Sequence, residues 1–418
     1  MFHSKHNNNT VYNFFIFIVL LYGTDLYSVP NPNALKKIYN IRDAVGIDLI
    51  KFPEYEDTVA YGAQPNALDS GHLKTLNSTF DWNNPQSYGI KSLKNTYVAK
   101  LHSAFTSPRQ LGTVFDYQQE FLFDIKVAPG IPIFWNLQQD VMHMAVLYHD
   151  KLATVQGPTL YYHWVIDRLP SILLLRKFIL QDPTIKLVIH NQHNSVAGYV
   201  HEYLHLLGIP SDQVIVANSN ALYHAETLYF ATPFLMEPIP KKLLSELRSE
   251  LIEAAYQKPS SREYKNNLVV IIQRREADRR ILNLAELVRT VNESFAHKGY
   301  EILIFDASMS VSEQIKIFNN ARLIIGVMAS GLTNVLYANP GASVIEIHPE
   351  LAYLANPQGI NDSGCEWCWW LSSIAGANYW VVPTRFTFAD SHVTVPLEPM
   401  KKILKQIVEK QEKFYEIV

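Results

Sequence analysis

Residues 321–348 carry the clearest fold signal in the chain and read ARLIIGVMASGLTNVLYANPGASVIEIH. Two apolar runs, 321–327 and 343–348, lie on either side of a segment that opens with Ser330 and Gly331. Apolar runs without polar alternation are typical of parallel strands that are buried on both faces. A strand, a helix and a second strand in this order predict a right-handed parallel crossover, and therefore an α/β domain.

The same alternation continues on both sides of this stretch. Helices are predicted after Asn283 and Ser310, because Glu286 and Glu313 stand three residues further on, as in capping boxes. The other predicted elements are strands at 267–273, 300–305 and 379–382, a charged helix at 396–418, and, earlier, strands at 186–190, 213–217 and 227–231 with a helix at 197–207. We therefore expect an α/β fold with a doubly wound parallel sheet in the second half.

Length and composition narrow the class of protein. The chain has 418 residues, which suggests two or three domains. It is 48% hydrophobic and 18% charged, so it can form real cores, and its net charge of -3 argues against a nucleic-acid partner. Prolines and a charged segment between residues 235 and 265 predict a boundary. We expect domains at 29–240 and 260–395, followed by a terminal helix at 396–418.

The N-terminus resembles a targeting segment. Residues 11–22 read VYNFFIFIVLLY, which is shorter than the roughly 20 residues that span a bilayer. Residues 1–28 are predicted to be a signal peptide or a membrane anchor, with a buried helix as the alternative. Acceptor triplets for N-glycosylation begin at Asn77, Asn292 and Asn361. We expect a secretory-pathway, Golgi-lumen or membrane-associated protein; a bacterial inner-membrane or cytoplasmic protein is the alternative.

The carboxyl ends of the predicted strands favour an anion site. Ligands of doubly wound sheets bind at this edge. Arg274 ends the strand at 267–273, while Gly326, Ser330 and Gly331 surround the next strand-to-helix turn, where free amides and the helix dipole suit a phosphate. The alternative is that the glycines only permit the turn and that the arginines pair with nearby acids. No Asp-x-Asp occurs in the sequence, which argues against a metal-dependent diphosphate site.

A second cluster lies in the first half. His163 and Asp167 are four residues apart, so a helix would place them on one face, where one could accept a proton while the other orients it. The alternative is a structural histidine with Asp167 paired to Arg168. Cys365 and Cys368 are compatible with a redox pair, half of a metal site or a local disulfide.

Five blocks in the right order resemble glycosyltransferase family 61, which includes plant xylan xylosyl- and arabinosyltransferases, the EGF-domain-specific O-GlcNAc transferase and bacterial capsular-polysaccharide enzymes. The similarity covers about residues 155–355. The blocks are 162–170 (YHWVIDRLP), 274–283 with its arginines, 312–315 (SEQI), 326–334 (GVMASGLTN) and 344–349 (VIEIHP).

The resemblance implies a GT-B architecture, in which two Rossmann-like domains face a cleft and the terminal helix crosses back to the first domain. It implies an inverting hexosyl- or pentosyltransferase that moves a sugar from a UDP-sugar to a glycan or glycoprotein hydroxyl without a metal cofactor. His163 and Asp167 would then be catalytic. The donor would be bound by residues in two blocks: Arg274, Arg279, Gly326, Ser330, Gly331, Leu332, Thr333 and Asn334.

The chain departs from the family at one position. Met328 stands where the family commonly has a histidine, and a thioether neither carries a proton nor binds phosphate strongly. A degenerate, non-catalytic protein that binds a nucleotide sugar or a glycan is therefore the alternative function. A nicotinamide-dependent oxidoreductase would share the sheet, but no G-x-G-x-x-G follows any predicted strand.

Overall fold

The structure is a computed structural model. It describes residues 36–38, 47–55, 96–107, 113–116, 121–123, 145–157, 159–190, 196–234, 239–260, 262–274, 279–295, 299–349, 366–384 and 392–417. The predicted N-terminal targeting segment, the triplets at Asn77 and Asn361, and Cys365 lie outside these residues. Within them, no helix is both long and apolar enough to cross a bilayer.

The second half contains a parallel sheet, as the sequence predicts. Its order is β11-β10-β12-β13-β14, and every neighbouring pair is parallel. The strands are β10 (Leu268–Ile272), β11 (Glu301–Phe305), β12 (Ala321–Val327), β13 (Ser343–Pro349) and β14 (Asn378–Thr384). All five side chains of β10 are buried, which explains its unbroken apolar run. The order reverses between β10 and β12, so the expected ligand crevice opens at their carboxyl ends.

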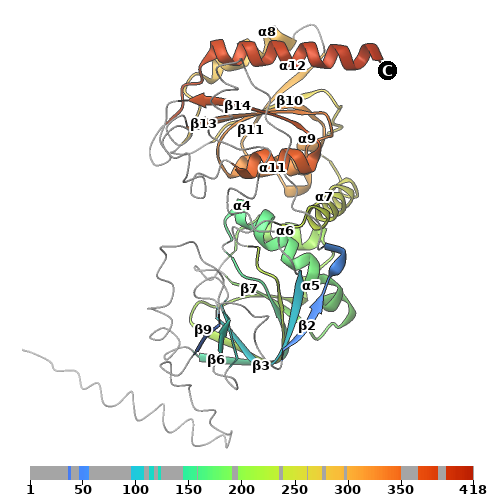
Figure 1. The fold of residues 1–418 in the computed structure, drawn as a ribbon, viewed down its shortest axis with the longest axis vertical. Coiled ribbons are helices and arrows are strands. Elements are labelled where there is room, and N and C mark those ends of the chain that lie inside the picture. Colours follow the sequence, from blue (N-terminus) through green and yellow to red (C-terminus); the bar gives the residue numbers. More distant parts are fainter. Residues whose placement is uncertain are drawn as a thin grey trace, which may run out of the picture.

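Helices cover both faces of this sheet (Figure 1). The outer face carries α8 (Leu284–Phe295) and α12 (Leu397–Ile417), and the inner face carries α9 (Val311–Asn319), η8 (Ser330–Tyr337) and α11 (Glu366–Ala375). Alternate residues of the strands pack in two separate hydrophobic cores. Val269 and Ile271 belong to the core on the outer face of the sheet, and Val270 and Ile272 belong to the core on the inner face. The sheet is therefore buried on both sides.

One of the two predicted helix caps is confirmed. The Ser310 side chain accepts a hydrogen bond from the Glu313 amide at the start of α9. The expectation that the Asn283 side chain caps α8 is wrong. This side chain pairs instead with the backbone of Val395: it donates to the Val395 carbonyl and accepts from the Val395 N–H, both at 2.9 Å. This side chain ties the segment before α8 to the segment that leads into α12.

The first half contains a mixed sheet. Its order is β1-β5-β4-β3-β9-β6-β7-β8, and β2 pairs with β3. The strands are β1 (Lys36–Ile38), β2 (Asp48–Lys51), β3 (Tyr97–Ser107), β4 (Thr113–Asp116), β5 (Phe121–Phe123), β6 (Ala145–Thr154), β7 (Lys186–Ile189), β8 (Val214–Val216) and β9 (Ala221–Ala231). The part formed by β9, β6, β7 and β8 is parallel, whereas β3 joins β9 antiparallel. The Rossmann-like pattern thus occupies one side of this sheet.

Short helices follow the parallel strands of the first domain. After β6 come α4 (Tyr161–His163), a π-helical turn (Trp164–Arg168) and α5 (Leu169–Gln181). α6 (Gly198–Leu206) follows β7, and two short 3-10 turns, η3 (Pro53–Tyr55) and η7 (Ser211–Gln213), complete the described elements of this domain. Figure 1 shows α4 and α6 at the end of the first domain that faces the second domain.

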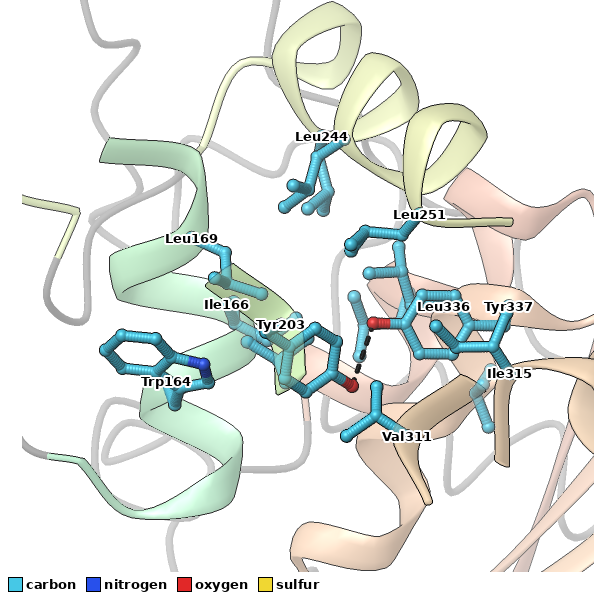
Figure 2. Close-up of a cluster of buried hydrophobic side chains, with 14 of the residues drawn as sticks. Trp164, Ile166, Leu169, Tyr203, Leu244, Leu251, Val311, Ile315, Leu336 and Tyr337 are labelled. Atoms are coloured by element: carbon cyan, nitrogen blue, oxygen red, sulfur yellow. Dashed lines mark hydrogen bonds between the residues drawn. The ribbon is translucent and has the colours of Figure 1, made fainter. Parts of the chain in front are cut away.

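The predicted boundary region is a structural bridge. α7 (Lys241–Tyr256) buries Leu243, Leu244, Leu247 and Leu251, and this face joins one hydrophobic core with residues of both domains. Figure 2 shows Leu244 and Leu251 beside Ile166 and Leu169 of the first domain and Leu336 of the second. Arg248 reinforces the contact by donating to the carbonyls of Leu336 and Ala338 at 2.8 and 2.7 Å. The two domains therefore share a continuous apolar interface.

The expectation for the C-terminal helix is wrong. α12 does not cross back to the first domain, because its buried residues Met400, Ile403, Leu404 and Ile407 pack in the outer core with α8. Figure 1 shows it on the face of the second domain that is turned away from the first. An amphipathic helix docks on whichever apolar face is open, and here that face belongs to its own domain.

Candidate active site

The turn between β12 and η8 forms one half of the candidate site. The Met328 amide donates to the Ile347 carbonyl at 3.0 Å, so the chain stays tied to β13 until η8 begins. Ala329 precedes η8 and provides no side-chain cap, while Ser330 is exposed and Gly331 half-buried. The first turn of η8 therefore offers uncapped backbone amides and the positive end of a helix dipole, which suit an anion.

Arg279 closes over this turn. Its backbone adopts a left-handed conformation with φ 56°, and its guanidinium Nη1 donates to the Met328 carbonyl at 2.9 Å. Arg274 follows β10, whose last residue Ile272 is paired in register with Gly326 of β12. Arg274 thus lies just after the strand next to the turn, and Arg279 is in direct contact with the turn.

The other residues predicted to bind the donor lie deeper. Leu332 and Thr333 are fully buried, and Asn334 is 1% exposed. Leu332 packs in the inner core, whereas the Asn334 amide donates to the carbonyl of Gly331 at 3.3 Å. Among the predicted donor residues of this turn, Ser330 and Gly331 are the ones that reach the surface. The side chains that follow them hold the turn in place.

Gly326 has no room for a side chain. A Cβ atom at this position would lie 2.9 Å from Leu332 Cδ2 and 3.1 Å from Ile272 Cδ1. We expect Gly326→Ala to lower the free energy of unfolding by about 1–3 kcal/mol, because overpacking forces these core side chains apart. Urea unfolding measures the change. Gly198→Ala is the matched control, since nothing lies within 4 Å of its Cβ, and equal unfolding curves for the two variants would contradict the prediction.

His163 and Asp167 form the other half of the site. His163 Nδ1 lies 2.6 Å from Asp167 Oδ2, and the two side chains are 24% and 2% exposed. The intervening π-helical turn closes with a hydrogen bond from the Leu169 amide to the Trp164 carbonyl, and such wide turns occur often at functional sites. A carboxylate that holds Nδ1–H leaves Nε2 as the ring atom that can take a proton. The sequence-based prediction of a mutual pair is therefore confirmed in geometry.

Burial sets the electrostatics of this pair. Burial raises the pKa of Asp167, while the His163 hydrogen bond and the nearby Arg168 act in the opposite direction. Arg168 is fully buried, and burial lowers its pKa to about 9. Its Nη1 donates to the His190 carbonyl at 3.2 Å and its guanidinium lies 5.6 Å from the Trp164 ring centre. Asp167 thus hydrogen-bonds to His163, and Arg168 contributes a buried positive charge behind it.

The fold brings the two halves together. α4, which ends at His163, packs against η8, and the Tyr161 hydroxyl donates to Asn334 Oδ1 at 2.7 Å. His163, which pairs with Asp167, therefore stands on a helix that packs against the element beginning at Ser330. No group of three or more potential metal ligands occurs among the residues that the structure describes.

Sequence reasoning missed two buried polar clusters. One is the set of tyrosines Tyr161, Tyr203 and Tyr337, which join three separate segments and have no spacing signal. The other surrounds Glu346 on β13: the Tyr379 hydroxyl and the Cys368 thiol bond to its carboxyl group. Cys368 is a buried free thiol on α11. The glutamate itself stood out only as a polar residue inside an apolar strand.

The two α/β domains form a GT-B-like fold, and the anion-type turn lies on an element that packs against the helix of His163. The family model described as Glycosyltransferase 61 matches residues 161–345, a range that contains both halves of the site. Over these residues the chain is similar to glycosyltransferase family 61, as the sequence blocks indicated. No curated protein matches the chain. The match supports a glycosyltransferase function in general.

Proposed function

We propose that the protein transfers a hexosyl or pentosyl group from a UDP-sugar to a hydroxyl of a glycan or glycoprotein, with inversion at the anomeric carbon. The observation that carries the proposal is the contact of the His163–Asp167 helix with the turn at Ser330 and Gly331 through the bond from Tyr161 to Asn334. A base and an anion site on adjoining elements are what such a transfer needs.

The proposed reaction is a single displacement. The acceptor oxygen attacks the anomeric carbon as the bond from that carbon to the β-phosphate oxygen breaks. The acceptor proton passes to His163 Nε2, and Asp167 stabilises the imidazolium that forms. The electron pair of the broken bond moves onto the diphosphate. The η8 amides and Arg279 stabilise that growing negative charge, and they take the place that a divalent cation holds in metal-dependent enzymes.

A nucleotide titration tests the donor class and the cation independence together. We expect UDP to bind in calorimetry more tightly than GDP or CMP, and to bind equally well in the presence of a chelator. Affinity for UDP that disappears with the chelator would overturn the metal-free part of the proposal. Binding of none of the three would overturn the donor assignment.

Met328 supports one alternative, a protein that binds a nucleotide sugar or glycan without turnover. Its side chain is 7% exposed and its carbonyl receives Arg279, so the residue is part of the turn. UDP binding without release of UDP from any UDP-sugar, with or without glycan acceptors, would favour this alternative. Met328→His would then be the first variant to test for recovered turnover.

Arg279 gives a prediction for donor binding. We expect Arg279→Gln to weaken UDP binding about 10- to 100-fold, because a hydrogen bond to a charged group contributes about 1.5–3 kcal/mol. Glutamine keeps a donor for the Met328 carbonyl and removes the charge. The matched control is Arg280→Gln, which removes an exposed neighbouring charge. Calorimetry measures both variants, and an equal loss in the two would show that only the general positive potential matters.

A further inference from the structure

A chain of buried hydroxyl groups crosses the interface between the domains. Tyr203 comes from α6 of the first domain and Tyr337 from η8 of the second, and their hydroxyls lie 3.0 Å apart (Figure 2). Both residues are fully buried. The Tyr161 hydroxyl lies 2.9 Å from that of Tyr203. Val311 adds a backbone link by donating to Glu202 at 2.7 Å, so the contact is fixed from two sides.

The direction of the hydroxyl chain follows from its ends. Each hydroxyl has one hydrogen to donate. The Tyr161 hydrogen goes to Asn334 Oδ1 at 2.7 Å, so at Tyr203 the Tyr161 oxygen must act as the acceptor. Tyr337 donates to Tyr203. The hydrogen bonds therefore run in one direction, from Tyr337 through Tyr203 and Tyr161 to Asn334, and such chains reinforce one another.

Asn334 connects the chain of hydroxyl groups to the anion-type turn. Its Nδ2 donates to the carbonyl of Gly331 at 3.3 Å and to Gln314 Oε1 at 3.4 Å. These bonds fix the side chain with Oδ1 toward Tyr161. Tyr161 opens α4, on which His163 stands two residues later. One continuous path therefore joins the proton-accepting helix to the backbone of the turn.

We propose that Tyr161 and Asn334 are positioning residues that set the distance between the base at His163 and the donor at Gly331. This inference rests on the proposed function. Neither side chain needs to touch a substrate. The Tyr161 hydroxyl would act only by aligning the base at His163 with the bound donor. The alignment of reacting groups affects turnover much more than it affects binding.

The test compares two tyrosines of the same cluster. Tyr161→Phe removes the bonds to Asn334 and to Tyr203, whereas Tyr337→Phe removes only the bond to Tyr203. The assay measures UDP release from the UDP-sugar that the wild type accepts as donor. We expect its kcat to fall about 10-fold in Tyr161→Phe and less than about twofold in Tyr337→Phe. The KM for the donor and the Kd for UDP should stay within about twofold in both variants.

The outcomes separate the two proposals. If the wild type releases UDP and the two variants have equal kcat values, the positioning role is wrong and the proposed function stands. A Tyr161→Phe variant that loses UDP affinity along with turnover would also overturn it, because the hydroxyl would then serve general stability. A wild type that neither binds UDP nor releases it from UDP-sugars would overturn the proposed function and this inference together.

Discussion

His163→Ala is expected to lower the rate of sugar transfer about 10²- to 10⁴-fold, the range that a positioned general base contributes. The ring is held through Nδ1 by Asp167 at 2.6 Å, so its removal takes away the only proton acceptor of the proposed displacement. Asp167→Asn should have an effect of the same kind, because a neutral amide no longer stabilises the imidazolium. Initial rates with a UDP-sugar donor and an accepted glycan measure both.

Controls separate a lost base from a damaged fold. UDP affinity should remain within a few-fold of wild type in both variants, because neither residue belongs to the turn at Gly331. His205→Ala is the matched histidine control, since His205 is exposed on α6 and bonded to Lys258. Turnover within a few-fold of wild type in both His163→Ala and Asp167→Asn would show that the base lies elsewhere.

Glu346→Gln is expected to change how stability depends on pH. Burial raises the pKa of the Glu346 carboxyl group to about 8, although hydrogen bonds from Tyr379 and Cys368 oppose the shift. In the unfolded chain the same group titrates near 4.5. Its contribution to stability is therefore complete below pH 4.5 and is lost as the pH rises toward 8, because only the unfolded state then releases the proton.

The size of this effect makes it measurable. Each pH unit between the two pKa values costs about 1.4 kcal/mol, so the loss between pH 4.5 and 8 is on the order of 5 kcal/mol. Urea unfolding at several pH values should show the wild type losing stability relative to Glu346→Gln as the pH rises. Glu398→Gln is the control, since that carboxylate is largely exposed and pairs with Lys401. If the stability of wild type and of Glu346→Gln changed with pH in parallel, the claim that Glu346 is neutral in the folded state would be wrong.

Much of the second domain could be predicted from local signals. The predicted strand at 321–327 coincides with β12, the one at 267–273 is longer than β10 by one residue at each end, and the one at 300–305 is longer than β11 by one residue at its start. Continuous apolar runs, a serine cap and a glycine after the helix are encoded within a few residues, so no long-range information is needed. The strand order predicted Arg274 at the ligand-binding edge of the sheet, whereas Arg279 was predicted only by the resemblance to the family.

Other expectations failed because they depend on packing between distant segments. Asn283 has the spacing of a capping box, but its side chain bonds to Val395, more than a hundred residues away. The amphipathic pattern of α12 shows that it has an apolar face but not which surface covers that face. Thr333 and Asn334 belong to the predicted turn, but only the structure shows that they are buried.

The sequence by itself determined the parallel α/β sheet and the turn at Ser330 and Gly331, because each depends on residues close together in the chain. The spacing of His163 and Asp167 allowed them to pair, and the structure decided between this pairing and the alternative with Arg168. Only the tertiary structure decided that Tyr161 joins Asn334, that Tyr203 meets Tyr337, and that Glu346 is sealed from water. The reason is physical. Hydrogen-bonding partners from separate segments, and the burial that shifts a pKa, arise only when those segments pack together.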